Sequence, residues 1–411
     1  LWTDPIDIRL SGFPASSDVT LTARYTGWGS SAVFHADGNG AIDLAVSAPS
    51  SGSYSGVDRE GIVWSMTQSK SDTDTGADPY ALRVTASVGD NQVASATLTR
   101  LVTTKDVTCA PVSDNGLVGY YCAKQGAPAI GGIVTFGGSE GGLGSGQGLA
   151  EYYASLGYPS LGLAYFGATG VPKELSEIPL EYFQTAFTWL AAKPEVNPEK
   201  IAVIGGSRGG ELALLLGATF PQVTAVVAVV PSGVSWGAPD ATGTQEVASW
   251  TYQGQPFAWI PYSATPEAKV TEPDGVVAYS DTPVFQAAMS AATSDQIAQA
   301  SSKVENTNGP IMMIAAADDQ IWPSCDLAKI SMDRLMSSGH QAKYGDTLEC
   351  YPDAGHNVTP FSLNVPTTSG MHSLTPEFGQ ILALGGTPSG IAHAARDSDD
   401  KTRAFLAKNL K

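Results

Sequence analysis

Short apolar runs that alternate with polar residues fill the first quarter of the chain. The clearest span 6–10, 19–23 and 41–45, and turn sequences such as 37–40 (DGNG) separate them. Alternation with period two places one face of a strand in a core and the other in water. Seven or so short strands over residues 1–115 predict a small immunoglobulin-like β-sandwich. The further candidate strands span 62–66, 80–86 and 92–98.

A different pattern begins after residue 116, where continuous apolar runs alternate with stretches of helical periodicity. Apolar runs rich in β-branched residues are typical of strands that are buried on both faces. Strands that alternate with helices form a mostly parallel sheet with helices on both faces. The predicted strands span 132–136, 161–166, 201–204, 225–230, 311–314 and 347–351, and the predicted helices span about 177–192, 326–338 and 399–410.

Residues 232–305 interrupt this alternation within the second domain, 116–411. The stretch is rich in Trp, Tyr, Pro, Ser and Asp. We interpret it as a cap-like insertion whose aromatic side chains wall an acyl pocket at the catalytic edge of the sheet. The alternative is a surface excursion without a role in the site. The aromatic residues in question are Trp236, Trp250, Tyr252, Phe257, Trp259 and Tyr262.

Charge and composition narrow the possible partners. The chain has 411 residues and a formal net charge of −18. Nucleic-acid binding needs a basic surface, so this class of partner is excluded. No apolar run approaches the length of a transmembrane helix, and no spacing of His, Cys or carboxylates is typical of a metal site. We therefore expect a small-molecule substrate and no metal or other cofactor, while the oligomeric state stays open.

The four cysteines are placed so that two disulfides can form. Asn115-Gly116 is a strong signal for a two-residue hairpin turn. Strands on either side of that turn would set Cys109 opposite Cys122 at a non-hydrogen-bonded position. There the Cα atoms lie about 4.5 Å apart, which is within disulfide reach. Elimination pairs Cys325 with Cys350, and the alternative is four buried free thiols.

Two disulfides favour an oxidising compartment. Such bonds persist in secreted and periplasmic proteins and are rare in the cytosol. We therefore expect an exported protein, extracellular or periplasmic, with a cytoplasmic location as the alternative.

The sequence around Ser207 predicts a buried strand, a sharp turn and a helix. The apolar run 201–204 precedes the motif Gly205-x-Ser207-x-Gly209, and leucines at helical spacing follow it. A serine at such a turn is held in a strained conformation with its hydroxyl above the sheet. The helix N-terminus beneath it favours a developing oxyanion. Ser207 is therefore the candidate nucleophile, although a glycine-rich chain could produce this motif by chance in a loop.

A serine nucleophile needs a histidine base, which a carboxylate in turn orients. In this architecture the acid and then the histidine follow the serine along the chain, each after a strand. Asp319 follows the strand at 311–314, and His356 follows the strand at 347–351. Asp318 is adjacent to Asp319, and spacing alone separates the two only weakly. The sequence assigns structural or exposed positions to three other histidines, namely His340, His372 and His393.

Two backbone N–H groups are needed to hold the oxyanion. One is expected from Arg208, the residue after the nucleophile. The other is expected from Gly138 or Ser139, in the glycine-rich loop that follows the strand at 132–136. That loop lacks the Lys-Ser/Thr that would follow in a phosphate-binding loop, so we do not interpret it as a nucleotide site.

Five segments of the second domain are informative together: FGGSEGGL (136–143), PLEYF (179–183), GSRGGEL (206–212), DDQIW (318–322) and CYPDAGH (350–356). They resemble the acyl-CoA thioesterase / bile-acid-CoA:amino-acid N-acyltransferase family of α/β-hydrolases. The N-terminal segments GSYSG (52–56) and WSM (64–66) are similar to the β-sandwich domain of that family.

The resemblance implies an α/β-hydrolase with Ser207 as nucleophile, Asp319 as acid and His356 as base. The amino-acid-conjugating branch uses cysteine as its nucleophile, so serine here favours hydrolysis of acyl thioesters. Three alternatives stay open: a secreted carboxylesterase acting on non-CoA esters, acyl transfer to an amino-acid amine, and a non-catalytic binding module. The sequence shows no obvious basic cluster for the phosphates of CoA.

Overall fold

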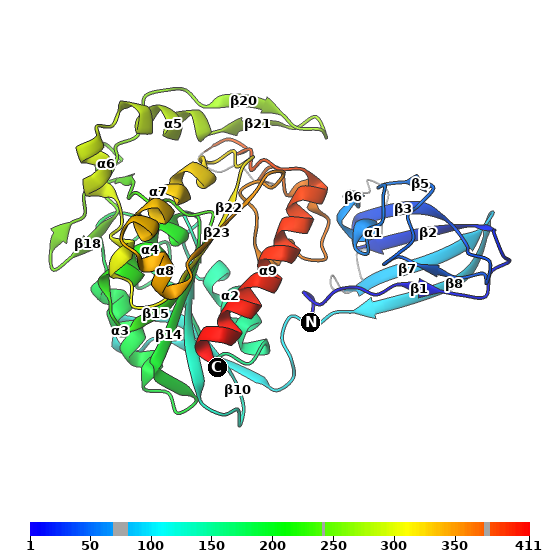
Figure 1. The fold of residues 1–411 in the computed structure, drawn as a ribbon, viewed down its shortest axis with the longest axis horizontal. Coiled ribbons are helices and arrows are strands. Elements are labelled where there is room, and N and C mark those ends of the chain that lie inside the picture. The colour runs from blue at the N-terminus through cyan, green and yellow to red at the C-terminus, as the bar shows by residue number, and fades with distance from the viewer. Residues whose placement is uncertain (69–80, 241–242, 374–378) are drawn as a thin grey trace.

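The computed structural model describes residues 1–68, 81–240, 243–373 and 379–411. A β-rich N-terminal part lies beside a larger part that is built from helices and strands (Figure 1). Helix α9 (Pro388–Leu410) is on the side of the larger part that faces the N-terminal part. No helix among the described residues is long and apolar enough to cross a membrane.

The N-terminal part contains a six-stranded antiparallel sheet and a separate pair of strands. The sheet has the order β5-β3-β2-β7-β8, with β6 paired to β3, and β1 pairs with β4. Residues of β2 alternate between a buried core and the surface, as predicted for 19–23. These sheets confirm the predicted β-sandwich. Its strands are β1 (Arg9–Leu10), β2 (Asp18–Tyr25), β3 (Trp28–His35), β4 (Ile42–Asp43), β5 (Ser51–Gly52), β6 (Thr67–Gln68), β7 (Ala81–Val88) and β8 (Asn91–Thr99).

One predicted strand of this part is wrong. Residues 62–66 were expected to be extended, but the short helix α1 (Gly61–Trp64) occupies most of this stretch. Ile62 and Val63 are both fully buried in the same core. Successive residues of a strand face opposite sides, whereas one helical turn can direct both side chains into one core, so packing overrides β-propensity here. In the predicted strand 80–86, Tyr80 lies outside the described residues.

The larger part is built on an eight-stranded sheet with the order β23-β22-β15-β14-β11-β12-β10-β9. Neighbouring strands from β23 to β12 in this order pair in parallel. At the other edge, β10 pairs antiparallel with both β12 and β9. Its strands are β9 (Val107–Val112), β10 (Val118–Lys124), β11 (Ile130–Phe136), β12 (Ser160–Ala164), β14 (Val196–Gly206), β15 (Val223–Val229), β22 (Ile311–Ala316) and β23 (Thr347–Tyr351).

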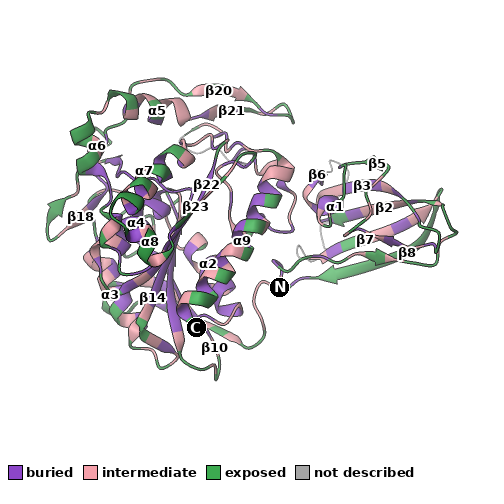
Figure 2. Cartoon of the chain, in the orientation of Figure 1, coloured by how far each residue is buried: buried purple, intermediate pink, exposed green. Residues whose placement is uncertain are grey.

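Helices cover both faces of this sheet and confirm the predicted α/β-hydrolase class. On β14, Ile201 and Val203 face the helices α3, α4 and α7, whereas Ala202 and Ile204 face α2 and α9. The sheet is therefore buried on both sides (Figure 2). The division at residue 115 stays a prediction, although β9, which precedes it, already belongs to this sheet. The helices are α2 (Gly144–Ser155), α3 (Glu181–Ala191), α4 (Arg208–Thr219), α7 (Ser324–Ser337), α8 (His340–Tyr344) and α9.

Helix α2 was not predicted, because glycines in a helix interior are unfavourable by about 1 kcal/mol each relative to alanine. The structure explains why one of these glycines, Gly146, is present. A Cβ on Gly146 would lie 2.9 Å from the Leu163 carbonyl oxygen, and a Cβ on Gly162 would lie 2.4 Å from the Gly146 carbonyl oxygen. The helix packs so closely on strand β12 that neither position has room for a side chain.

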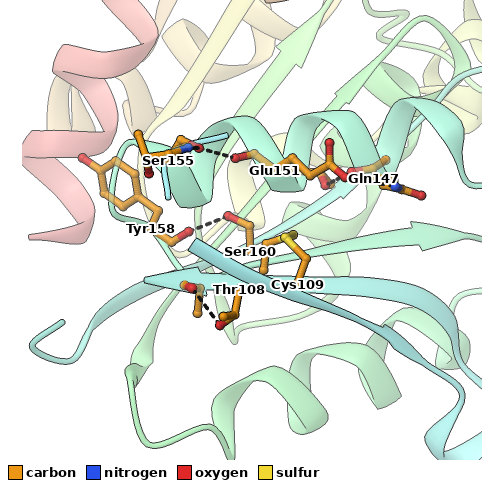
Figure 3. Close-up of a disulfide and its surroundings, with 12 residues drawn as sticks. Thr108, Cys109, Gln147, Glu151, Ser155, Tyr158 and Ser160 are labelled. Carbon is orange, nitrogen blue, oxygen red and sulfur yellow. Dashed lines mark hydrogen bonds between the residues drawn. A yellow bond between two sulfur atoms is a disulfide. The ribbon is translucent and has the colours of Figure 1, made fainter. Parts of the chain in front are cut away.

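The hairpin between β9 and β10 has the predicted register and disulfide. Asn115 and Gly116 have φ of 55° and 78°, and the N–H of the residue after them closes the turn at 3.0 Å, as in a type I′ turn. Cys109 lies opposite Cys122 with a Cα–Cα distance of 4.1 Å, and the two are bonded. Figure 3 shows Cys109 near Ser160, with helix α2 close by. The second predicted disulfide, Cys325–Cys350, is also present and joins α7 to β23.

The insertion folds as short strands and helices outside the main sheet. Trp236 and Trp250 are fully buried, and Tyr252 packs against the main core. Tyr262, by contrast, lines a cavity beside Ser207. Its elements, with the partner strand β13, are β13 (Ile178–Pro179), β16 (Gly237–Pro239), β17 (Glu246–Ala248), β18 (Trp250–Tyr252), β19 (Gln255–Pro256), β20 (Ala268–Thr271), β21 (Val277–Ser280), α5 (Thr282–Ala291) and α6 (Ser294–Ala300).

The N-terminal part docks on the segment that follows His356 and on α9. The Trp2 ring stacks on Phe361 with centroids 5.8 Å apart. The Arg100 guanidinium donates to the carbonyl oxygens of Trp2 at 2.9 Å and of Asn364 at 2.7 Å. These contacts fasten the segment that follows His356 to the N-terminal part.

Candidate active site

Ser207 occupies the sharp turn between β14 and α4. Its backbone has φ 58° and ψ −126°, a conformation that is costly for residues other than glycine. Its N–H donates to the Val229 carbonyl oxygen on β15 at 2.9 Å, which ties the turn to the next strand of the sheet. This strand, turn and helix have the arrangement that projects a serine hydroxyl beyond the carboxyl end of a parallel sheet.

Glycines allow the turn to pack against its neighbours. A Cβ on Gly205 would lie 2.4 Å from the Gly209 carbonyl oxygen, and a Cβ on Gly209 would lie 2.3 Å from the Gly137 carbonyl oxygen. Side chains at these positions would therefore force the turn apart. A Cβ on Gly138 would lie 2.9 Å from the Cβ of Ser207. The glycine-rich loop after β11 is thus in direct contact with the candidate nucleophile.

Asp319 and His356 form a hydrogen-bonded pair at the same edge of the sheet. Both carboxylate oxygens of Asp319 lie 2.9 Å from His356 Nδ1. Asp319 is only 3% exposed, and its Oδ1 also accepts the backbone N–H groups of Ile321 at 3.0 Å and Trp322 at 3.3 Å. These donors hold the carboxylate in place. The carboxylate in turn fixes the proton on Nδ1 and leaves Nε2 as the basic nitrogen.

Asp318 binds different groups. Its Oδ1 accepts from Gln320 Nε2 at 2.8 Å, and its Oδ2 accepts the Gly386 N–H at 2.9 Å. The structure therefore places Asp319, and not Asp318, against His356, a choice that spacing along the chain left open.

Ser207 and His356 line the same two adjoining cavities. The first, of about 380 Å³, lies between the glycine-rich loop, the insertion and the segment after β22. The second, of about 300 Å³, extends toward β11, α2 and the segment that follows His356. Glu140 and Leu384 also line both. A substrate whose reactive carbonyl reaches Ser207 can therefore extend in two directions, as the acyl and leaving groups of an ester or thioester do.

The other histidines considered as bases are engaged away from Ser207. Each has an acidic partner of its own, so the expectation of structural or exposed positions agrees with their contacts. Among the described residues, His356 is the histidine that lines the two cavities. The partners are Asp346 at 2.6 Å for His340, Asp274 at 2.9 Å for His372 and Asp58 at 2.6 Å for His393.

The glycine-rich loop contains Glu140, a carboxylate that was not among the residues predicted for the site. Glu140 Oε2 accepts the N–H of Gly138 at 2.9 Å. One of the three expected oxyanion donors is thus already engaged, which leaves the N–H groups of Ser139 and Arg208 as candidates. The position of Glu140 two residues after Gly138, within the loop next to the nucleophile, was the signal available in the sequence.

The side chain of Arg208 is buried beneath the site. Its guanidinium lies 3.0 Å from the Glu211 carboxylate and donates to the Trp236 carbonyl oxygen at 3.1 Å. Glu211 Oε1 also accepts from Trp250 Nε1 at 2.6 Å. Burial raises the pKa of Glu211 to about 7 against the opposing influence of Arg208. These contacts tie the first turn of α4 to the insertion.

No three His, Cys, Asp or Glu side chains among the described residues are grouped as a metal site requires.

Two solved structures match about three quarters of this chain. A hyperthermophilic esterase from Pyrobaculum calidifontis matches 75% of this chain and 87% of its own with 15% identity and a TM-score of 0.43. A dienelactone-hydrolase-like phosphotriesterase from metagenomic libraries matches 74% of this chain and 100% of its own, with 16% identity and a TM-score of 0.43.

Sequence relatives cover the whole chain. Acyl-coenzyme A thioesterase 6 of Homo sapiens is 26% identical over 430 residues, which span 100% of this chain and 94% of the relative. Acyl-coenzyme A thioesterase 1 of Mus musculus is 27% identical with the same coverage. The mitochondrial acyl-coenzyme A thioesterase 2 of Rattus norvegicus is 27% identical over 100% of this chain and 87% of its own length.

Two family models match separate parts of the chain. The model described as the acyl-CoA thioester hydrolase/BAAT N-terminal region matches residues 3–114. The model described as the BAAT / acyl-CoA thioester hydrolase C terminal matches residues 178–411 and includes Ser207, Asp319 and His356. The chain therefore belongs to the BAAT / acyl-CoA thioester hydrolase family.

Proposed function

We propose that the protein is a serine hydrolase of acyl thioesters that acts through Ser207, His356 and Asp319. The observation that carries this proposal is the hydrogen bond from His356 to the buried Asp319, because His356 lines the two cavities that Ser207 also lines. The family and the thioesterase relatives support thioester cleavage.

In the proposed reaction, His356 Nε2 takes the proton of Ser207 Oγ as that oxygen attacks the acyl carbonyl. The C–S bond then breaks, and the protonated imidazole transfers its proton to the departing sulfur. Water next attacks the acyl-enzyme, and His356 takes a proton from it and returns one to Ser207 Oγ. The net reaction converts a thioester and water into a carboxylic acid and a thiol.

The oxyanion is proposed to bind to backbone N–H groups rather than side chains. Arg208 supplies one of them, because the first N–H groups of a helix have no partner within the helix. Ser139 supplies the other, since the neighbouring Gly138 N–H is bonded to Glu140.

A carboxylesterase acting on non-CoA esters is the second candidate. Two disulfides fit an oxidising compartment, and we propose export from the cytosol, where acyl-CoA would be scarce. Oxoesters and thioesters are attacked by the same serine. Parallel assays with palmitoyl-CoA and p-nitrophenyl esters separate the two candidates by their relative kcat/KM.

Replacement of Ser207 with alanine tests the catalytic proposal. Loss of the nucleophile should lower kcat by about 10⁶-fold and abolish labelling by a fluorophosphonate probe. The thermal unfolding midpoint serves as the control for folding, because alanine removes only one oxygen. Activity near that of the wild type in a folded Ser207→Ala protein would mean that another group carries the reaction.

A further inference from the structure

The larger cavity beside Ser207 has carboxylates on several sides. Glu140 approaches it from the glycine-rich loop, Glu267 from the segment before β20, and Asp281 from the N-terminus of α5. Glu140 and Glu267 are exposed, and Asp281 is half-buried. Three carboxylates from three separate elements therefore converge on one cavity of about 380 Å³ that also contains the candidate nucleophile.

Little positive charge offsets these carboxylates within the described part of the cavity wall. Arg208 is the one lysine or arginine there, and its guanidinium is paired with Glu211 at 3.0 Å. Asp281 Oδ1 is buried and accepts no hydrogen bond from the described residues. Burial, and then the negative charge of Glu267, raises the pKa of Asp281 to about 6. A cation bound beside this carboxylate would favour its charged form.

Aromatic rings form another wall of the same cavity. The Phe285 ring packs edge-on against Tyr262 at 5.5 Å and against Trp322 at 5.6 Å between centroids. All three residues line the cavity. Aromatic faces attract organic cations through their quadrupoles, and they do so most strongly where water is excluded. Carboxylates together with aromatic rings form the chemistry that selects an amine or a quaternary ammonium group.

The smaller cavity differs in character. Apart from Glu140 and the catalytic residues, its walls are mostly apolar and include Leu149, Ile204 and Val229. Such a cavity suits a hydrocarbon chain.

We propose that this enzyme acts on substrates with an organic cation, which binds in the larger cavity between the Glu267 and Asp281 carboxylates and the Tyr262, Phe285 and Trp322 rings, while the acyl chain occupies the smaller cavity. The inference rests on the proposed serine-hydrolase function. It implies that the polyanionic leaving group of an acyl-CoA is disfavoured here, because its phosphates would meet like charges at close range.

The test compares two substrates that differ only in charge. Butyrylthiocholine and its uncharged carbon isostere, S-(3,3-dimethylbutyl) thiobutyrate, share the acyl group and the shape of the leaving group. Their kcat/KM values are measured by thiol release and divided by the rate of hydroxide-catalysed hydrolysis of each compound, which removes the difference in intrinsic reactivity. Wild type should prefer the cation by about tenfold or more, and the preference should shrink as salt screens the charges.

Variants locate the origin of this preference. Combined Glu267→Gln and Asp281→Asn should bring the ratio close to one. Asp295→Asn, which removes an exposed carboxylate from α6 of the same insertion, should leave it unchanged. Glu267→Gln alone, at an exposed position, provides the comparison if the double variant fails to fold. A ratio of one or less in the wild type would overturn the inference, and so would the wild-type ratio in the double variant and in Glu267→Gln.

Labelling by a fluorophosphonate distinguishes a failure of the proposed serine-hydrolase function from a failure of the cation-binding inference alone. If a fluorophosphonate labels Ser207 and the neutral isostere is cleaved without any preference for the cation, only the cation-binding inference fails. If Ser207 is not labelled and neither thioester is cleaved, the proposed function fails and the inference fails with it.

Discussion

At the scale of single residues, local contacts determine which of two adjacent aspartates can orient His356. Asp319 is fixed by backbone N–H groups and faces His356 Nδ1, whereas Asp318 accepts from Gln320 and Gly386. The two side chains differ by one position in sequence but occupy separate hydrogen-bond networks. Their amide variants therefore form a matched pair.

Asp319→Asn should lower kcat by about 10⁴-fold, because an amide in place of the carboxylate favours the wrong imidazole tautomer and cannot stabilise the protonated ring. Asp318→Asn should retain most of the activity, since His356 keeps its partner. Steady-state kinetics on one p-nitrophenyl ester provides the comparison. Equal losses in the two variants would argue against Asp319 as the residue that positions His356.

At the scale of elements, the turn from β14 to α4 depends on close contacts between backbones. The predicted strand, turn and helix around Ser207 are all present, and a Cβ at Gly205 or Gly209 would collide with neighbouring backbone. Gly206 differs, because a Cβ there would meet its nearest neighbours only at 3.9 Å.

Gly205→Ala should therefore cost about 1–3 kcal/mol of unfolding free energy through overpacking, while Gly206→Ala should stay within about 0.5 kcal/mol of wild type. Urea denaturation of the two variants measures the difference. If Gly205→Ala were as stable as Gly206→Ala, the helix and strand would have to separate more easily than these contacts allow.

At the scale of the whole molecule, charged groups join the N-terminal part to α9. His393 Nε2 pairs with Asp58 at 2.6 Å, and Arg396 pairs with Glu60 at 2.7 Å. The hydrogen bond to Asp58 raises the pKa of His393, although partial burial opposes it. Burial would raise the pKa of Asp58, but hydrogen bonds from His393 and Trp64 outweigh it and lower that pKa.

These shifts predict how the contact depends on pH. The raised pKa of His393 gives stability that is full below its unfolded value of about 6.5 and is lost as pH rises through the folded value. The lowered pKa of Asp58 gives stability that is present above its unfolded value of about 3.9 and is lost as pH falls through the folded value. The pair should stabilise the molecule most between about pH 4 and 6.5.

The melting temperature of wild type should accordingly fall more between pH 6 and 8 than that of His393→Gln. Asp58→Asn should flatten the same slope, and the double variant should behave like either single variant. High salt should weaken the effect, because the His393 side chain is 63% exposed. Parallel slopes in wild type and His393→Gln would show that this pair does not contribute.

The sequence by itself determined the class of each domain, the strand and helix around Ser207, and the pairing of Cys109 with Cys122. Strong apolar periodicity, a turn that requires positive φ and a fixed hairpin register are local properties, so they can be read without the rest of the chain. The residue types expected for the site follow from the chemistry of serine nucleophiles.

Tertiary structure decided what depends on contacts between distant segments. Packing made a helix of residues 61–64 and another helix, α2, from a glycine-containing stretch. It buried Trp236 and Trp250 completely. It also set Asp319 against His356 and brought Glu140, Glu267 and Asp281 to one cavity. These residues are far apart in the sequence and meet only in the folded chain. The burial of a side chain and the total charge of a site depend on all the residues that surround it, so they cannot be read from any one position.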